Sequence, residues 1–448
     1  MAEHNGYIST ALSGPGGVFA QPPSITLSFP TAYLGTLPGV TITWSTVYGE
    51  WASSYRVSAY FRERLLFSQT GEGEGVTSVL SGDVSGYDKL VVEILAWSQP
   101  FHRARVESII LGVDKTFQKR DLISFSANLS ADPLSGVLPH SEISFSIFNG
   151  DGAYNPDNPR GAARYLMERQ EVSVRYGYRL GDEVEWIPGG IFYLSDWDLS
   201  QNGIEASFSA QNALEYMTDF YEGPETGTLL EIAQAALEQA GLPPMPDGSP
   251  RWVLDGSLGA IPIPEQEENQ ELSKQSVAVV LQYAANAGRC VFYQDRSGKI
   301  HIEPLSTALS DYPIDRFNSY GNPQVRLSKQ LKAVDINNGA YVLRVSTVGE
   351  TQPVSNPLIS LEEAPETAAW VADYLENRRS LTGSFRLDPR LDPLDLVQVE
   401  NRFSQTIALV TDVNLEYNGV FKGSYTARGI ASAMSYSYYS GDLYAGEV

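Results

Sequence analysis

Apolar and polar residues alternate with a period of two through most of this 448-residue chain. Every second residue is apolar from Ser24 to Phe29, and the same alternation returns at residues 143–147 and 204–210. This pattern is typical of strands that bury one face and leave the other in water. Turn-forming segments such as GEGEG at 71–75 separate the runs. The chain is therefore predicted to be mainly β, with antiparallel sheets.

Three segments have the period of a helix instead. Residues 228–240 carry their apolar side chains on one stripe and begin with a capping box. Further helices are expected at about 274–287 and about 365–378. A hairpin with the turn sequence DRSG at 295–298 follows the second helix. These elements predict an α+β part within the mainly β chain.

The order of the patterns predicts five consecutive parts. They are an N-terminal arm or single leading strand at 1–20, a β-sandwich or jelly roll at 21–113, an antiparallel barrel or sandwich at 114–222, a small α+β domain at 223–310, and a second β-rich block at 311–448 with one helix and a Tyr-rich tail.

The formal net charge of the chain is −23. Binding to phosphate backbones takes a surface of lysine and arginine, so this charge argues against nucleic-acid binding. An acidic wall can instead let DNA pass without sticking. The charge is equally explained by the solubility that a large particle component needs, and composition does not separate these two interpretations.

The sequence gives no sign of a membrane or secretory segment. No apolar run approaches the ~20 residues that span a bilayer, and the first residues, MAEHNGYIST, lack the pattern of a signal peptide. Cys290 is the only cysteine, so an intrachain disulfide and a thiolate zinc site are excluded, and the thiol is predicted to be buried and inert. We expect the protein to fold in the cytoplasm in which it is made, with no membrane insertion.

The polar residues of the sequence do not form a recognisable catalytic or metal-binding pattern. None of the four histidines has another histidine or a cysteine at metal-ligand spacing, and no G-x-S-x-G elbow, P-loop or Rossmann glycine pattern occurs. Asp196 and Asp198 share one face of a strand about 7 Å apart, a separation found in inverting glycosidases. Because many structural strand pairs have the same spacing, a catalytic role is not favoured. The sequence predicts no enzyme.

The segment FNGDGAYNPDNPRG at 148–161 is rich in oxygen ligands. Asp151, Asn155 and Asp157 could ligate calcium, but the segment lacks the spacing and the terminal Glu of an EF-hand. Hydrogen-bonded Asx turns are the preferred interpretation. No metal and no cofactor are predicted.

Six aromatic residues of the first β-rich part are candidate platforms for a sugar, namely Trp44, Trp51, Tyr55, Tyr60, Trp97 and Phe101. Trp44 and Trp97 fall in strand patterns and are predicted to be core residues. Trp51, in the turn YGEWASS, is the best candidate for an exposed ring, and Tyr55 and Arg103 are further candidate glycan contacts. Binding of host-surface carbohydrate through this part is thus the alternative function.

An ordered set of motifs resembles phage and prophage tail proteins of the baseplate-hub type. The motifs are an N-x-D-G-x-[FY]-N-P-x-N-P loop at Asn149 to Pro159, an R-Q-x-V-x-V-R-Y-G strand at Arg169 to Gly177, a G-x-F-Y-L strand at Gly190 to Leu194 and an A-x-[DN]-A-L segment at Ala210 to Leu214. The helix pair, the hairpin CVFYQDRSGKIHIEP and the C-terminal segment DPRLDPLDLVQVENR also resemble that family.

The resemblance implies a fold, an assembly and a place in the cell. Two tube-forming β-barrels would lie within 114–222 and 311–448, and three copies would form a ring of pseudo-sixfold symmetry. This homotrimer would join the tail tube to the distal tip and let DNA or the tape-measure protein pass. Its partners would be the tube protein, the tape measure and a tip fibre or spike. It would be located in the virion tail and assembled in the bacterial host's cytoplasm.

The first β-rich part resembles a different kind of module. The run YDKLVVEILAWSQPFHRARVESIILG at 87–112 is similar to galactose-binding-like jelly rolls of the discoidin type. Such modules bind glycans in some proteins and serve as spacers in others, so the resemblance leaves glycan binding open.

Overall fold

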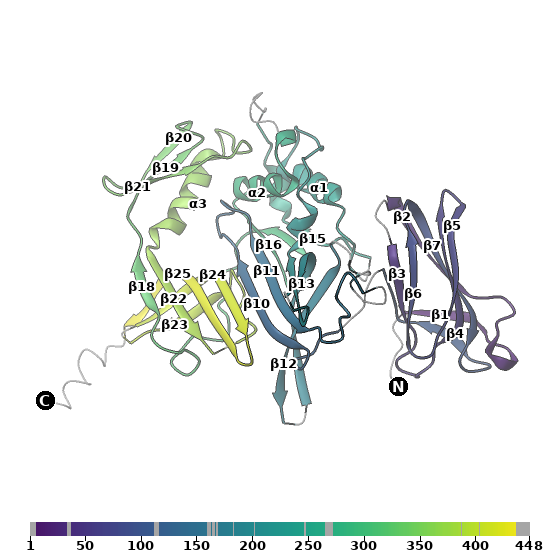
Figure 1. The fold of residues 1–448 in the computed structure, drawn as a ribbon. Helices are drawn as coiled ribbons and strands as arrows, with labels where there is room; N and C mark the ends of the chain where they lie inside the picture. Colours follow the sequence, from purple (N-terminus) through teal and green to yellow (C-terminus); the bar gives the residue numbers. More distant parts are fainter. Residues whose placement is uncertain are drawn as a thin grey trace. The chain divides into compact units, whose positions relative to one another are not determined.

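The structure is a computed structural model that describes residues 6–33, 37–111, 116–158, 163, 166, 169–181, 183–200, 202–245, 248–264, 272–386, 388–402 and 404–435. The described residues are mainly in β-strands and contain three α-helices, which confirms the predicted mainly β fold with an α+β part (Figure 1). They divide into two compact units, and the domain boundaries given above remain a prediction. One unit consists of 1–121, 148–170 and 199–206, and the other of 122–147, 171–198 and 207–448.

The first unit is a β-sandwich. A four-stranded antiparallel sheet in the order β2-β7-β4-β5 and a three-stranded sheet in the order β6-β3-β9 contribute to one hydrophobic core. The segment at 1–20 supplies a leading strand, β1, that pairs with β8. The strands are β1 (Tyr7–Leu12), β2 (Ser24–Tyr33), β3 (Leu37–Thr43), β4 (Ala52–Phe61), β5 (Arg64–Glu72), β6 (Thr77–Val84), β7 (Tyr87–Trp97), β8 (Arg103–Val106) and β9 (Ser108–Leu111).

Three aromatic residues form the centre of the sandwich. Trp44 packs edge-on against Tyr55 and Trp97, with ring centroids 5.4 and 6.0 Å apart, and all three rings are fully buried. Each indole N–H is satisfied, because Trp44 donates to the Ser78 hydroxyl and Trp97 to the Glu50 carboxylate, both at 2.8 Å. The prediction that Trp44 and Trp97 are core residues is confirmed.

The second unit contains a ten-stranded sheet. Its order is β12-β13-β14-β11-β10-β24-β25-β22-β18, and β23 pairs with β24. The strands are β10 (Leu122–Ser130), β11 (His140–Phe148), β12 (Glu171–Leu180), β13 (Glu183–Leu199), β14 (Glu205–Gln211), β18 (Gln324–Leu327), β22 (Arg379–Phe385), β23 (Leu396–Glu400), β24 (Ser404–Tyr417) and β25 (Phe421–Ser435).

The arrangement of these strands differs from the expected pair of barrels. Strands of both β-rich blocks share the one sheet, because β10 pairs with β24 from Phe125 opposite Tyr417 to Ser130 opposite Asp412. Among the described residues the sheet is open, and β12 and β18 are its two ends. Alternation in a sequence shows which face of a strand is buried, but it does not show which strand lies beside it.

The helices and the smaller sheets complete the second unit. Thr228 forms the predicted capping box with Glu231, and Gly241 ends the helix at a φ of 64°. The second helix begins three residues later than expected, because the Ser276 hydroxyl caps it. The elements are α1 (Leu229–Ala240), α2 (Val277–Ala287), α3 (Ala364–Glu376), a sheet of β15 (Trp252–Leu254), β17 (Ile300–Glu303) and β16 (Val291–Gln294), and a sheet of β20 (Tyr341–Arg344), β19 (Leu331–Ile336) and β21 (Glu350–Val354).

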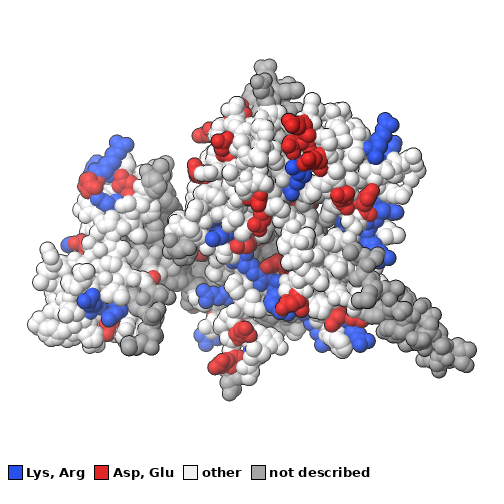
Figure 2. All heavy atoms as spheres, turned by 180° about the vertical axis from the view of Figure 1, so that it is seen from behind, with Lys and Arg blue, Asp and Glu red and all other residues white. Residues whose placement is uncertain are grey.

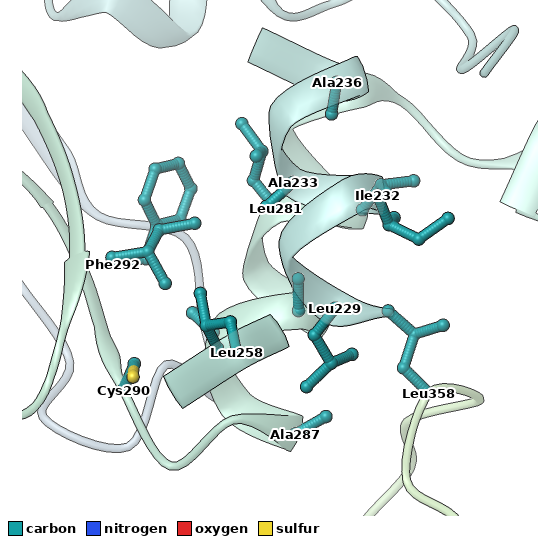
Figure 3. Packing of buried hydrophobic residues seen from close by; sticks show 14 of the residues in the cluster. Leu229, Ile232, Ala233, Ala236, Leu258, Leu281, Ala287, Cys290, Phe292 and Leu358 are labelled. Carbon is teal, nitrogen blue, oxygen red and sulfur yellow. The ribbon is translucent and has the colours of Figure 1, made fainter. Parts of the chain in front are cut away.

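One core holds these elements together. Figure 3 shows Leu229, Ile232 and Leu281 of the two helices close to Phe292 of β16 and to Leu358. Cys290 is buried in the same cluster, as predicted. In the part of the chain that the structure describes, no helix is long and apolar enough to cross a membrane.

Candidate functional site

The two ends of the ten-stranded sheet are the most unusual surfaces of the second unit. At one end, β12 and β13 form a hairpin whose pairs run from Glu171 opposite Tyr193 to Leu180 opposite Glu183. The tip of this hairpin projects beyond the other strands of its sheet (Figure 1). The residues of the tip are exposed on both faces, whereas Tyr176, Gly189 and Gly190 at its base are buried. The tip is therefore an unpartnered piece of sheet.

Large apolar side chains cover this tip. Tyr178 and Leu180 lie on one face, and Val184 and Trp186 lie on the other, as the register of the pairs dictates. Tyr178 is 64% exposed and Trp186 is 60% exposed. Gly177 makes room for the indole, because a β-carbon there would lie 2.8 Å from Cζ3 of Trp186. Exposed edges with such residues are places where another chain binds or aggregation begins.

The two faces of the tip differ in charge. Glu183 and Glu185 share the face of Tyr178, while Arg175 and Arg179 share the face of Trp186. All four charged side chains are exposed, and none makes an ion pair among the described residues. Figure 2 shows acidic and basic groups together on the projecting hairpin. The Glu183–Glu185 face is thus an acidic and apolar surface, and its two carboxylates form no ion pair among the described residues.

The base of the hairpin is fixed in place. Tyr176 is buried and packs edge-on between Phe125 and Phe421, with both centroid distances at 6.2 Å. Burial raises the pKa of the Tyr176 hydroxyl well above its usual range. A bulge follows between Val174 and Arg175, opposite Gly189. The aromatic contacts hold the base, so the exposed tip extends from a rigid support.

An ion pair clamps the same base from the α+β part. Arg296, in the turn between β16 and β17, donates to both carboxylate oxygens of Asp392, at 2.5 and 2.8 Å. The same guanidinium donates to the Pro188 carbonyl of β13 at 2.9 Å. Bidentate pairing of this kind fixes orientation as well as charge. One side chain therefore joins the turn, the bulge of β13 and the loop before β23.

A cavity of about 240 Å³ lies beside this clamp. Its lining includes Asp295, Glu303, Asp392 and Asp395, with Arg296 among them. Tyr312 donates a hydrogen bond to Asp395, and Tyr293 donates to Glu303 at 2.7 Å. Within the described ranges no group of three or more His, Cys, Asp or Glu is placed to hold a metal ion. The hydrogen bonds and the ion pair around this cavity connect the β16–β17 hairpin, Tyr312 and the loop before β23.

The opposite end of the sheet is β18, and all four of its residues are exposed. Val325 and Leu327 point to one face, and Leu327 is 64% exposed. Arg326 on β18 and Arg379 on β22 are also exposed, and neither has an ion-pair partner in the described part of the chain. Basic groups gather along the side of the unit that carries β18 (Figure 2). This end is therefore basic and apolar.

The three predicted glycan contacts have different environments in the first unit. Tyr55 is 1% exposed, so its ring is not available to a ligand, which corrects the expectation of an exposed platform there. Strand β4 turns Tyr55 toward the core. Trp51 is half-buried and donates its indole N–H to the Gly73 carbonyl at 2.9 Å. Arg103 is exposed and donates to the Ser9 carbonyl at 3.4 Å.

The other polar motifs have structural hydrogen bonds. Asp196 accepts from the backbone N–H of Trp197 at 2.8 Å, and Asp196 and Asp198 are both exposed. In the segment after β11, Asp151 and Asn155 each accept from the N–H two residues ahead, at 3.0 and 2.9 Å. These are the predicted Asx turns.

No protein-family model and no curated protein matches the sequence. Solved structures with a similar fold include the 43 kDa tail protein of prophage MuSo2 from Shewanella oneidensis, at 13% identity and a TM-score of 0.45 over 71% of this chain and 96% of that one. A tail protein from Neisseria meningitidis MC58 has 11% identity and a TM-score of 0.44 over 72% and 94% of the two chains. Prophage tail protein gp18 from Listeria monocytogenes EGD-e has 11% identity and a TM-score of 0.42 over 75% and 96%.

Proposed function

We propose that this chain is a structural, non-enzymatic subunit of the tail tip of a bacteriophage or phage-like particle. The observation that carries the proposal is a single sheet with two open ends, β12 and β18. Both ends expose apolar residues, and both carry charged side chains that form no ion pair among the described residues. An exposed sheet edge that carries large apolar residues is a surface on which another protein chain can bind. The ordered tail-protein motifs support the particle type.

The two ends of the sheet complement each other. The hairpin tip offers Glu183 and Glu185 beside Tyr178. The β18 end offers Arg379 on the face of Leu327 and Arg326 on the opposite face. Different surfaces on one subunit give head-to-tail contacts, which close into a ring when the rotation between copies allows it. A homotrimeric ring is the closed form that the motif resemblance implies.

In this proposal the ring joins the tail tube to the distal tip. Its partners are the tube protein, the tape measure and a tip fibre or spike. The ring is assembled in the bacterial host's cytoplasm and becomes part of the virion tail. DNA and the tape-measure protein pass through its lumen. The net charge of −23 supports passage without binding, because the chain repels phosphate.

The experiment is a measurement of mass in solution by light scattering across a concentration series, followed by negative-stain imaging of the same peak. We expect a species of three chains and rings with an open centre. A monomer at every concentration, also after mixing with the tube protein, would overturn the proposal.

A further inference from the structure

A buried carboxylate organises one end of the β-sandwich. Glu50 is 6% exposed and lies 2.8 Å from the Trp97 indole nitrogen and 2.7 Å from Nδ1 of His102. Arg105 donates to the same carboxylate at 3.4 Å. A buried charge with three partners is costly to disturb, so it holds His102 and Arg105 in fixed positions.

The neighbouring residue, Phe101, is strained and exposed. Its φ is 63°, in the left-handed region that a bulky side chain rarely adopts, and its ring is 63% exposed. Buried Ser13 maintains this conformation with three hydrogen bonds. The N–H of Phe101 donates to the Ser13 carbonyl at 3.0 Å, the N–H of Ser13 donates to the His102 carbonyl at 2.9 Å, and the N–H of His102 donates to the Ser13 hydroxyl at 3.2 Å. A strained residue that the fold holds so firmly is a signal of function.

A second exposed ring lies beside the same carboxylate network. The Arg105 guanidinium is 4.3 Å from the centroid of the Tyr48 ring, and Tyr48 is more than half exposed. The side chain of His102 is also about half exposed, and its Nε2 atom has no partner among the described residues. The surface therefore presents two exposed aromatic rings and an imidazole nitrogen, while the Arg105 side chain is only 18% exposed and contacts Glu50 and the Tyr48 ring.

We propose that Tyr48, Phe101, His102 and Arg105 form a saccharide-binding site. The apolar C–H face of a pyranose ring packs on an aromatic ring, and few, fixed polar groups then select the sugar through its hydroxyls or a carboxylate. His102 Nε2 supplies such a group, and the Arg105 guanidinium holds the Tyr48 ring in position. Arg103, two residues before Arg105 on β8, lies on the same face of the strand and adds an exposed cation.

The site differs from the platform predicted by the sequence. It keeps Phe101 from the candidate platforms and adds Tyr48, and it does not use the half-buried Trp51 or the core residue Tyr55. Since all of its residues belong to the first unit, it does not depend on the proposed assembly of the second unit.

The test is binding of the full-length chain to an array of bacterial saccharides, with neutral polysaccharides and uronic-acid polymers as separate groups. We expect binding to at least one saccharide. Phe101→Gly and Tyr48→Ala should each weaken it by about tenfold or more, because each removes an aromatic contact. Phe101→Gly also relieves the positive φ, so it should melt no earlier than the unchanged protein.

The matched control is Leu65→Ala, which removes an exposed apolar residue at the opposite end of the β4–β5 hairpin. This variant should bind like the unchanged protein. Absence of binding across the array, or equal binding by the Phe101→Gly and Tyr48→Ala variants, would overturn the site. The oligomeric mass of these variants should be unchanged, so failure of this site is distinguishable from failure of the assembly proposal.

Discussion

Arg296 and Asp392 form a bidentate ion pair that ties the β16–β17 turn to the loop before β23. Both side chains are largely buried, and Arg296 also holds the Pro188 carbonyl at the base of the projecting hairpin. The position of the hairpin base therefore depends on a residue from a different part of the unit.

Asp392→Asn should destabilise the second unit, because it leaves the Arg296 guanidinium without its counter-charge. The pair is more buried than a surface pair and less buried than a core pair, so we expect a loss of roughly 1–3 kcal/mol in the free energy of unfolding. Urea unfolding followed by far-UV circular dichroism measures it. Lys329→Ala, which breaks the exposed pair with Glu350, is the control and should cost at most about 1 kcal/mol. Equal effects of the two variants would show that the clamp has no special role.

The hairpin tip should be dispensable for folding and necessary for association. Replacing Tyr178 and Trp186 by Ser removes exposed rings that contribute little to the core of the monomer. We expect the melting temperature to change by no more than a few degrees, since surface substitutions are usually within about 0.5 kcal/mol. Sedimentation velocity should show a shift toward monomers. If the oligomer stays intact, the tip does not form the contact.

Cys290 should be unreactive while the fold is intact. Burial raises the pKa of its thiol to about 12, and only the thiolate reacts with iodoacetamide. The unfolded chain has a thiol pKa of about 8.5. The unfolded state therefore loses the proton first, and the thiol lowers stability as the pH rises from about 8.5 toward 12. Mass spectrometry should find no modification at pH 8 in buffer and complete modification in concentrated urea. Rapid modification of the native chain would contradict the buried position.

Local features were predictable from the sequence because their causes are local. Thr228 and Glu231 form the capping box three residues apart, and the Asx turn at Asp151 depends on an N–H two residues away. Burial of Trp44 followed from its place in an alternating strand.

Features that depend on distant partners were not predictable. The pairing of Phe125 with Tyr417 joins strands from opposite ends of the second unit's sequence, and no periodicity encodes it. The turn sequence DRSG predicts that Arg296 is exposed to solvent. Tertiary packing instead places its side chain in a largely buried ion pair with Asp392. Tyr55 is buried because of the side on which the second sheet packs, which alternation alone does not specify.

Charge reversal at the two ends of the sheet tests the central claim most directly. Glu183→Lys with Glu185→Lys reverses the charge of one face of the hairpin tip, and separately Arg326→Glu with Arg379→Glu reverses the charge on both faces of the β18 end. Each double variant places like charges on both sides of the proposed contact. Light scattering should show that each double variant is monomeric, while the chain that carries all four changes regains the mass of the original oligomer. Arg175→Glu with Arg179→Glu, on the other face of the hairpin, is the control and should assemble normally. Assembly that survives both reversals, or a four-fold variant that stays monomeric, would contradict the account.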